Sequence, residues 1–243
     1  MTRLSVNLNK VALLRNARDI GIPSVIEAGQ ICIDAGAHGL TVHPRPDERH
    51  IRAADVYDLA GLIADAPAVE YNIEGNPFVE PFLPLVRAVQ PTQATLVPDD
   101  PNARTSDHGW AVAAHAERLR PVVEELTALG IRVSLFMDPD PDEITHAASL
   151  GVDRIELYTE PYATAYGSGT FDAILAQYAH AADTAQTLGL GVNAGHDLNL
   201  DNLPAFCAIP GVLEVSIGHA LTADALKMGL AAAVAAYLAA LGT

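Results

Sequence analysis

The chain has 243 residues, half of them hydrophobic, so it is long enough to bury a substantial core within one domain. Its formal net charge of −16 argues against a nucleic-acid partner, because binding a duplex requires a clustered positive surface. With only two cysteines and no uninterrupted apolar stretch at its N-terminus, the sequence predicts a cytoplasmic protein without a membrane span.

Strand-like and helix-like segments alternate along the whole chain. The β-rich runs fall at 4–9, 39–43, 69–74, 94–98, 132–138, 154–159, 189–194 and 213–217. Apolar residues at helical spacing predict helices at 22–36, 53–65, 78–90, 112–129, 141–150, 170–188, 199–208 and 221–241. Glycine recurs where a helix gives way to a strand, as in 128-ALGIR-132, because it adopts the left-handed turn without a Cβ penalty.

Eight strands alternating with eight helices predict an α/β protein, a single-domain (β/α)8 TIM barrel over residues 1–243. A doubly wound open sheet is the alternative. Such sheets usually carry a glycine-rich phosphate loop after the first strand, whereas 7-NLNK-10 contains no glycine. The long polar segment 99–113 interrupts the alternation directly after the fourth strand. We interpret it as a lid over a catalytic mouth, with an ordinary surface loop as the alternative.

Residues that bind anions or transfer protons stand at the ends of most predicted strands. In chain order they are Asn7, Asn9, His43, Arg45, Glu74, Thr105, Glu156, His196, Gly218 and His219. Because all barrel strands end at one mouth, we expect these side chains to meet there. Histidine exchanges protons near neutral pH, and burial beside Ile73 should raise the pKa of Glu74. The sequence therefore predicts acid–base chemistry on an anion.

Two places are expected to bind the anion. Gly218 and His219 open the last helix, where free backbone N–H groups form the usual phosphate site of this fold. Half of the 14 basic residues lie in the first 52 positions, and Arg45 and Arg49 belong to the loop of His43. The alternatives are structural histidines, an ordinary charged surface and, for Glu156, an ion pair with Arg154.

A metal centre is disfavoured by the spacing of the candidate ligands. Zinc sites commonly contain two histidines one or four residues apart, whereas His43 and His50 are separated by seven positions. The charges of Arg45 and Arg49 would also repel a cation. We therefore expect no metal and no cofactor.

Seven segments, in the same order over nearly the whole chain, carry a resemblance to a known family. They are 7-NLNKVALLRNAR-18, 41-TVHPRPDERHI-51, 72-NIEGN-76, 96-LVPDDPNARTSDHG-109, 133-VSLFMD-138, 192-VNAGHD-197 and 217-IGHA-220. In these the chain resembles the pyridoxine 5′-phosphate synthase family. The resemblance implies a (β/α)8 barrel, a homo-oligomer (commonly an octamer) and a transferase of vitamin B6 biosynthesis. The implied reaction joins 1-deoxy-D-xylulose 5-phosphate to 3-amino-2-oxopropyl phosphate and releases phosphate and water.

The resemblance also implies a role for each matching residue. His43 and Glu74 would act as proton acceptors, His196 as a proton donor, and Glu156 as the stabiliser of a charged transition state. The residues that would hold the aminoketone phosphate are Asn7, Arg18, Gly218 and His219, and those for the deoxyxylulose phosphate are Arg45, His50 and Thr105.

The chain departs from the commonest family pattern at substrate-binding positions. Where many members have Asn-x-Asp-His, this chain has Asn9 and Lys10 in place of the acid and the imidazole, and Asp197 replaces a frequent glycine. We expect Lys10 to supply positive charge to the sugar phosphate and Asp197 to pair with the amine of the second substrate.

Two other functions are weighed against this one. A lysine such as Lys10 could condense with a ketone, as in a Schiff-base aldolase, and borohydride trapping of a covalent adduct would reveal it. A phosphometabolite-binding barrel without catalysis is the second. The four acid–base residues, His43, Glu74, Glu156 and His196, argue against it, because a binding protein has no need of them.

Substitution of the two departing residues tests these contacts. Lys10→Ala should raise the KM for the ketose phosphate, because a positive charge is lost from its phosphate. Asp197→Ala should weaken binding of the aminoketone phosphate, because the amine of this substrate loses a carboxylate partner. Steady-state kinetics with each substrate varied in turn measures both effects, and an unchanged constant removes the corresponding contact.

Overall fold

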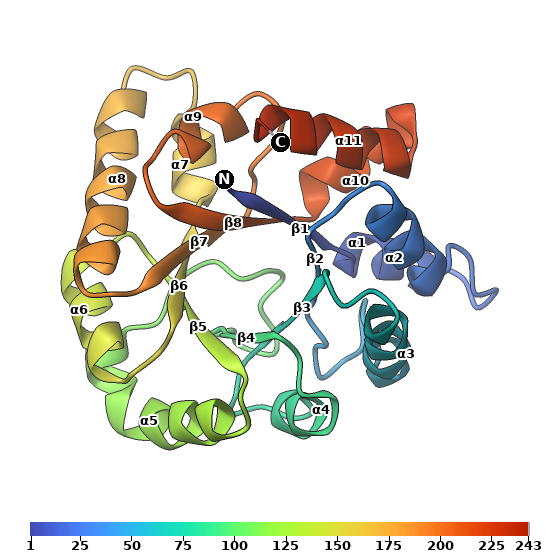
Figure 1. The fold of residues 1–243 in the computed structure, drawn as a ribbon, viewed down its shortest axis with the longest axis horizontal. Helices are drawn as coiled ribbons and strands as arrows, with labels where there is room; N and C mark the ends of the chain where they lie inside the picture. Colours follow the sequence, from blue (N-terminus) through green and yellow to red (C-terminus); the bar gives the residue numbers. More distant parts are fainter. Residues whose placement is uncertain (243) are drawn as a thin grey trace.

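Eight parallel strands form one closed barrel in the computed structural model, which describes residues 1–242 (Figure 1). Each strand pairs with the next in the chain and β8 pairs with β1, so the predicted (β/α)8 TIM barrel is confirmed. The strands are β1 (Arg3–Asn7), β2 (Gly39–Val42), β3 (Glu70–Gly75), β4 (Gln93–Leu96), β5 (Arg132–Met137), β6 (Arg154–Tyr158), β7 (Gly191–Gly195) and β8 (Val212–Ile217).

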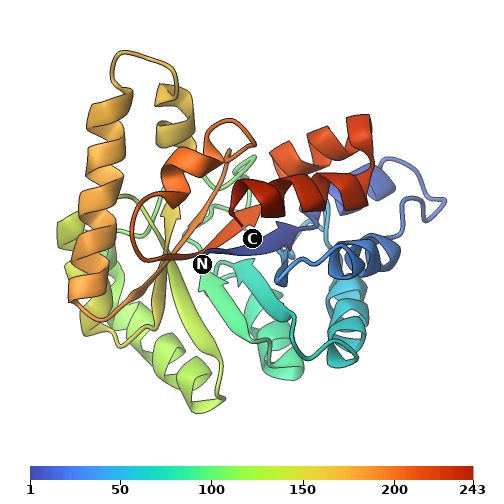
Figure 2. The ribbon, with the colours of Figure 1, turned by 45° about the horizontal axis from the view of Figure 1, so that its top comes forward.

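The helices surround the barrel, as Figures 1 and 2 show. They are α1 (Asn9–Asn16), α2 (Val25–Asp34), α3 (Ala53–Ala64), α4 (Phe82–Val89), α5 (Val112–Ala128), α6 (Pro141–Ser149), α7 (Glu160–Ala165), α8 (Phe171–Thr187), α9 (Leu203–Cys207), α10 (His219–Met228) and α11 (Leu230–Ala240). The last of these, α11, packs against β1 and α2 and so brings the two ends of the chain close together. None of the described helices combines the length and the hydropathy that crossing a bilayer requires.

The predicted elements were wrong in a few places. The strand expected at 4–9 ends at Asn7, because the Asn7 side-chain oxygen accepts the backbone N–H of Asn9 at 3.0 Å and turns the chain into α1. The helix expected at 221–241 is two helices, since Gly229 has a φ of 88° that a helix cannot contain. Two short helices, α1 and α7, were not predicted. The polar segment 99–113 is a loop only to Ala111, because α5 begins at Val112.

The interior of the barrel is polar, whereas the apolar core lies between the strands and the helices. Strand residues alternate between the two sides, and the outward set, including Leu40, Ile73 and Leu135, belongs to one large apolar core. The inward set is buried, and most of it is hydrogen-bonded: Ser5, Thr41, Asn72, Thr95 and Asn193 all contact polar neighbours, whereas the Ser134 hydroxyl has no hydrogen-bond partner among the described residues. Barrel interiors are usually filled with branched aliphatic residues. Here a hydrogen-bonded stack lies beneath the mouth instead.

One hydrogen bond shows directly that these polar residues face each other inside the barrel. The Asn193 side-chain amide on β7 donates to Gln93 Oε1 on β4 at 3.3 Å. Since β4 and β7 are not neighbours in the sheet, this bond crosses the interior.

Arginine–glutamate pairs occupy the opposite end of the barrel from the mouth. Glu70 accepts hydrogen bonds from Arg132 and, at 2.5 Å, from Arg3, all three at the first positions of their strands. Arg154 lies 3.6 Å from Glu214 and donates to Asn193 at 3.0 Å. Arg154 therefore pairs with Glu214, and the alternative that it partners Glu156 is wrong.

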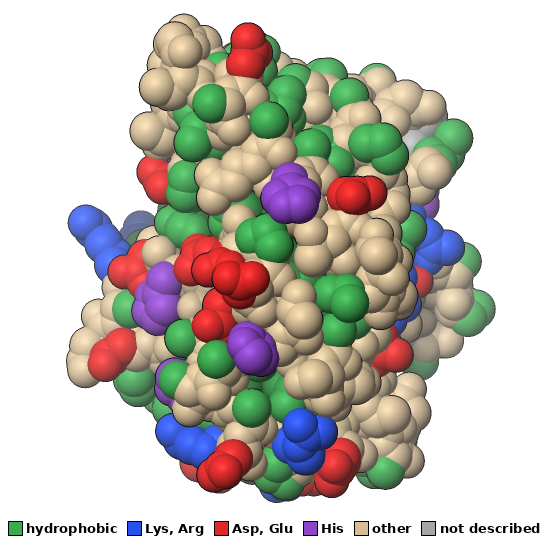
Figure 3. Space-filling model, turned by 90° about the vertical axis from the view of Figure 1, so that its left-hand side faces the viewer, with side chains coloured by type: hydrophobic (Ala, Val, Ile, Leu, Met, Phe, Trp, Pro, Cys, Tyr) green, Lys and Arg blue, Asp and Glu red, His purple; other side chains and the backbone are tan. Residues whose placement is uncertain are grey.

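Asp and Glu lie near the middle of the molecular face that carries α6 and α8, with Lys and Arg toward its margins (Figure 3). This face therefore lacks the continuous basic patch that a nucleic acid would require.

Removal of the Glu70 carboxylate, which Arg3 and Arg132 share, tests its contribution to stability. Glu70→Ala should lower the free energy of unfolding by about 2 kcal/mol, because Arg3 and Arg132 lose charge-assisted hydrogen bonds. Urea denaturation measures the loss. The matched control is Glu125→Ala, whose pair with Arg87 is exposed and should contribute less than about 0.5 kcal/mol. Equal losses for the two variants would contradict a structural role for the arginine–glutamate pairs at this end of the barrel.

Candidate active site

Two histidines and two glutamates meet at the carboxyl ends of the strands. Glu74 and Glu156 belong to β3 and β6, while His43 directly follows β2 and His196 directly follows β7. His43 Nδ1 lies 3.9 Å from Glu74 Oε2, and both side chains are buried. His196 is close enough for its charge to lower the pKa of His43. The two histidines therefore lie near each other at the same end of the barrel.

The pKa values of the two carboxyl groups are both raised. Burial raises the pKa of Glu74 well above its ordinary value, and the nearby Glu156 raises it further. Burial, reinforced by the charge of Glu214, raises the pKa of Glu156 to about 8. Glu156 consequently retains its proton at pH 7 and can donate a hydrogen bond to a negative oxygen.

A strained turn after β7 positions His196. His196 and Asp197 have φ values of 82° and 55°, a region that residues other than glycine rarely adopt. The Thr159 hydroxyl stabilises this turn by donating to the carbonyls of Gly195, at 2.7 Å, and of His196. The His196 ring packs against Phe136 and Tyr158, with centroid distances of 5.5 and 5.4 Å.

Glycine at the tip of β7 leaves room for the end of the Glu156 side chain. A Cβ atom on Gly195 would lie 2.3 Å from Glu156 Oε1, far inside van der Waals contact. The missing side chain thus leaves the space that the Glu156 carboxyl occupies.

The asparagines that follow β1 hold the acid–base residues in place. Asn9 Oδ1 accepts the backbone N–H of His43 at 2.9 Å, and the Asn7 amide donates to Glu74 Oε2 at 3.5 Å. Gly218, which precedes α10, lies against Asn7, since a Cβ there would be 3.1 Å from the asparagine side chain. Asn7 and Asn9 therefore brace the catalytic groups from the first strand.

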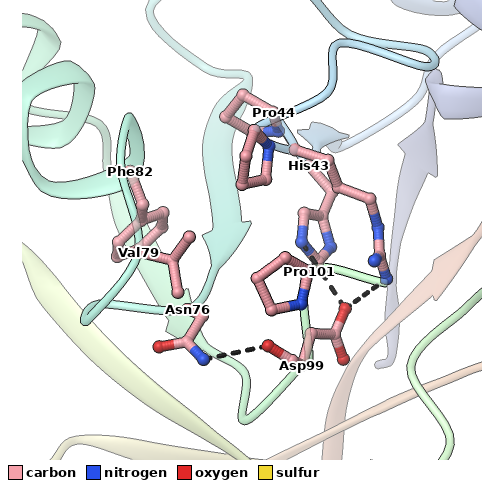
Figure 4. Close-up of a pocket in the computed structure, with 9 residues that line it drawn as sticks. His43, Pro44, Asn76, Val79, Phe82, Asp99 and Pro101 are labelled. Atoms are coloured by element: carbon pink, nitrogen blue, oxygen red, sulfur yellow. Dashed lines mark hydrogen bonds and ion pairs between the residues drawn. The ribbon is translucent and has the colours of Figure 1, made fainter. Parts of the chain in front are cut away.

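Arg45 is buried and fully engaged by the loop that follows β4. It pairs with the Asp99 carboxylate and donates to the Ala103 carbonyl at 3.0 Å. Arg49 reaches the same loop through the Ala103 and Pro101 carbonyls, at 2.8 and 3.0 Å. Figure 4 shows the hollow that His43, Asn76 and Asp99 line beside this loop.

His50 lies next to His43 in the same loop. The two ring centroids are 6.2 Å apart, and His50 Nδ1 accepts the N–H of Ile51 at 2.9 Å. Burial, aided by the charge of Arg45, lowers the pKa of His50 to about 4, so its ring is neutral at physiological pH.

Several predicted residues lie apart from this group. Thr105 is exposed, and its neighbour Ser106 is buried and donates to Asp99 Oδ2 at 2.9 Å. Arg18 lines a separate hollow of about 190 Å³ with Arg15 and Arg52. Asp197 and His219 are exposed at the rim.

The effect of the Lys10 charge on nearby histidines places this residue near the mouth of the barrel. It is the second residue of α1 and partly buried. Its positive charge lowers the pKa of both His50 and His196, two histidines that come from opposite halves of the chain.

Sequence reasoning missed two features of the mouth. One is Asp99, which was considered only as part of the lid although it stands three residues after the end of β4. The other is a small apolar cluster of Val97, Phe136 and Tyr158, separate from the main core, against which His196 packs. Strict alternation from the inward Ser134 would have indicated that Phe136 also faces inward.

Among residues 1–242, no three His, Cys, Asp or Glu side chains are arranged so that they could hold a metal ion.

The chain matches known proteins over nearly its full length. The family model described as "Pyridoxal phosphate biosynthesis protein PdxJ" matches residues 4–243. The chain is 57% identical over 242 residues to the pyridoxine 5′-phosphate synthase of Albidiferax ferrireducens, covering 98% of this chain and 96% of the relative. It is 55% identical over 244 residues to the pyridoxine 5′-phosphate synthase of Xylella fastidiosa strain 9a5c, with 98% and 94% covered.

Solved structures share the fold at low sequence identity. Phosphoribosyl anthranilate isomerase from Thermotoga maritima superposes with a TM-score of 0.64 at 16% identity, covering 100% of this chain and 99% of that one. Thiamine phosphate pyrophosphorylase from Pyrococcus furiosus gives a TM-score of 0.60 at 12% identity, with 99% and 95% covered. At such identity these matches show the barrel fold alone.

Replacing Glu156 by its neutral amide tests the raised pKa. A carboxyl whose pKa is higher in the folded than in the unfolded chain destabilises the fold increasingly as pH rises from the unfolded pKa toward about 8. Glu156→Gln removes this penalty. Its free energy of unfolding should therefore exceed that of the parent chain by at least about 1 kcal/mol at pH 8, and by much less at pH 5. Calorimetric melting at both pH values measures the difference. A gain independent of pH would contradict the assignment.

Proposed function

The chain belongs to the pyridoxal phosphate biosynthesis protein PdxJ family and is a synthase of vitamin B6 biosynthesis, and from this we propose how the barrel mouth performs the reaction. The proposed substrates are 1-deoxy-D-xylulose 5-phosphate and 3-amino-2-oxopropyl phosphate, which condense to pyridoxine 5′-phosphate with release of phosphate and water. The observation that carries the proposal is the convergence of His43, Glu74, Glu156 and His196 at the carboxyl ends of the strands.

The four residues divide the proton transfers among themselves. Imine formation, the eliminations and an aldol-type ring closure each move protons, which requires several titratable groups in one place. His43 and Glu74 accept protons from the substrates, and His196 donates one to a leaving oxygen. Protonated Glu156 stabilises negative charge that develops on a substrate oxygen, because its raised pKa keeps its proton available at pH 7.

Two separated sites take the two phosphates. One consists of the backbone N–H groups at the start of α10, next to Gly218 and His219, where the helix dipole favours an anion. The other is Arg45 with His50 beside it. Lys10 adds positive charge to the site of the ketose phosphate. Asp197 lies at the rim, where it pairs with the amine of the second substrate.

The loop from Val97 to Ala111 is proposed as the lid of this single-domain enzyme. Its contacts support this role, because Arg45, Arg49 and Asn76 hold its carbonyl and carboxylate oxygens over the hollow. Thr105 is exposed in the present arrangement and reaches a ligand only if the loop moves.

We also propose a homo-oligomer, an octamer by family resemblance, that works in the cytoplasm. Exposed apolar side chains on α1 and the segment after it, among them Leu14, Ile20 and Ile22, together with Leu226 on α10, support subunit contacts. Both cysteines are unpaired, as expected in a reducing compartment. Sedimentation of the purified protein tests the assembly, and a monomer at micromolar concentration would exclude it.

The activity itself is tested by mixing the purified protein with both phosphates and no added metal. Pyridoxine phosphate absorbance and inorganic phosphate should appear together. His43→Ala and Glu74→Gln should each lower kcat by a factor of about 100 or more, because a positioned acid or base is lost. His180→Ala, an exposed histidine on α8, is the matched control and should keep full activity. Absence of product from the parent chain would refute the proposed function.

A further inference from the structure

Asp99 lies between the proposed base and the proposed phosphate-binding arginine. The residue is 5% exposed, and its Oδ2 accepts hydrogen bonds from Arg45 Nη2 and, at 2.9 Å, from Ser106 Oγ. The same oxygen is 3.7 Å from His43 Nε2. Figure 4 shows the Asp99 carboxylate beneath the His43 ring. One carboxylate oxygen thus serves three groups at once.

The three contacts differ in what substrate binding would do to them. A phosphate on Arg45 competes with Asp99 for the same guanidinium, because both are anions that the planar fork of arginine recognises. Asp99 would nevertheless remain at the site. Asn76 holds its backbone carbonyl at 2.9 Å and Ser106 holds its carboxylate, both independently of Arg45.

We propose that Asp99 is a positioning residue. When the ketose phosphate binds, the Asp99 carboxylate gives up its pair with Arg45 and pairs with His43, and this transfer makes His43 a stronger base. The inference rests on the proposed roles of His43 and Arg45. It adds an acid that the family resemblance does not assign, and it explains why the catalytic base and the phosphate-binding arginine share one loop.

The surroundings of His43 show why such a device is needed. The charged and titratable groups that face it are Arg45, Arg49 and His50 from its own loop, Glu74 from β3, Asp99 from the loop after β4, and His196 from the turn after β7. Burial, followed by the charge of Arg45, holds the pKa of His43 well below its ordinary value. A bound phosphate offsets the charge of Arg45 and leaves the charge of Asp99 free to stabilise the imidazolium. Both changes raise the pKa of His43 and strengthen it as a base.

Asp99→Asn tests the transfer, because it keeps the shape and removes the charge. We expect kcat to fall at least tenfold and the acid limb of the kcat profile to move to lower pH by about one unit, because His43 loses the anion that raises its pKa. Binding of 1-deoxy-D-xylulose 5-phosphate alone, measured by calorimetry, should become tighter, since Arg45 no longer has an internal partner. Asp99→Glu should restore the position of the limb.

Asp107→Asn is the matched control. It removes the same charge from an exposed position of the same loop and should leave both the profile and the binding within about twofold of the parent chain. Weaker ketose phosphate binding in Asp99→Asn, with an unmoved acid limb, would show that Asp99 merely fastens the loop and would overturn the inference.

A measurement without turnover separates this inference from the proposed function. The pKa of His43, followed by NMR, should rise when the ketose phosphate is added to the parent chain and should rise by less in Asp99→Asn, where only the offset of the Arg45 charge remains. Product formation by the parent chain with an unchanged His43 titration would refute the inference alone. Absence of product refutes the proposed function, whatever the titration shows.

Discussion

Burial of carboxyl groups inside a closed barrel is the constraint on which this site depends. Closing the sheet removes Glu74, Glu156 and Glu214 from bulk water, and their proximity to one another makes ionisation of all three unfavourable. Arg154 offsets part of this penalty for Glu214. Burial raises the pKa of Glu74, which makes it a stronger base, and raises that of Glu156 to about 8, which keeps its proton at neutral pH.

The polar interior separates the catalytic layer from the stabilising core. Hydrophobic burial comes from the outward faces of the strands and the helices that cover them, so the inward positions are free to hold hydrogen-bonded polar groups. Local departures from ideal geometry are concentrated at the mouth. His196 and Asp197 adopt left-handed backbone angles beside Gly195, whose missing side chain makes room for Glu156. Strain at these positions is held by Thr159, which directly follows the neighbouring strand β6.

The loops that follow β2 and β4 complete the site. The segment after β2 supplies His43, Arg45 and His50, and the segment after β4 closes on it through Asp99, Pro101 and Ala103. Asp99 neutralises Arg45, which prevents uncompensated positive charge in a buried place. They also link the occupancy of the phosphate site to the surroundings of the base.

The sequence by itself determined the fold class and the common mouth. Eight β-rich runs separated by helical periodicity indicate parallel strands, and parallel barrel strands all end on one side, so His43, Glu74, Glu156 and His196 could be placed together without coordinates. Tertiary structure decided which side chains touch across the loops. Asp99 and Arg45 are separated by 54 positions, and no local pattern indicates that they pair. The same holds for Ser106 rather than Thr105 at the site, for Arg18 in a separate hollow, and for Arg154 beside Glu214. Hydrophobic periodicity indicates which face of a segment is buried. These pairings, by contrast, arise only when the barrel closes and fixes the distances between loops.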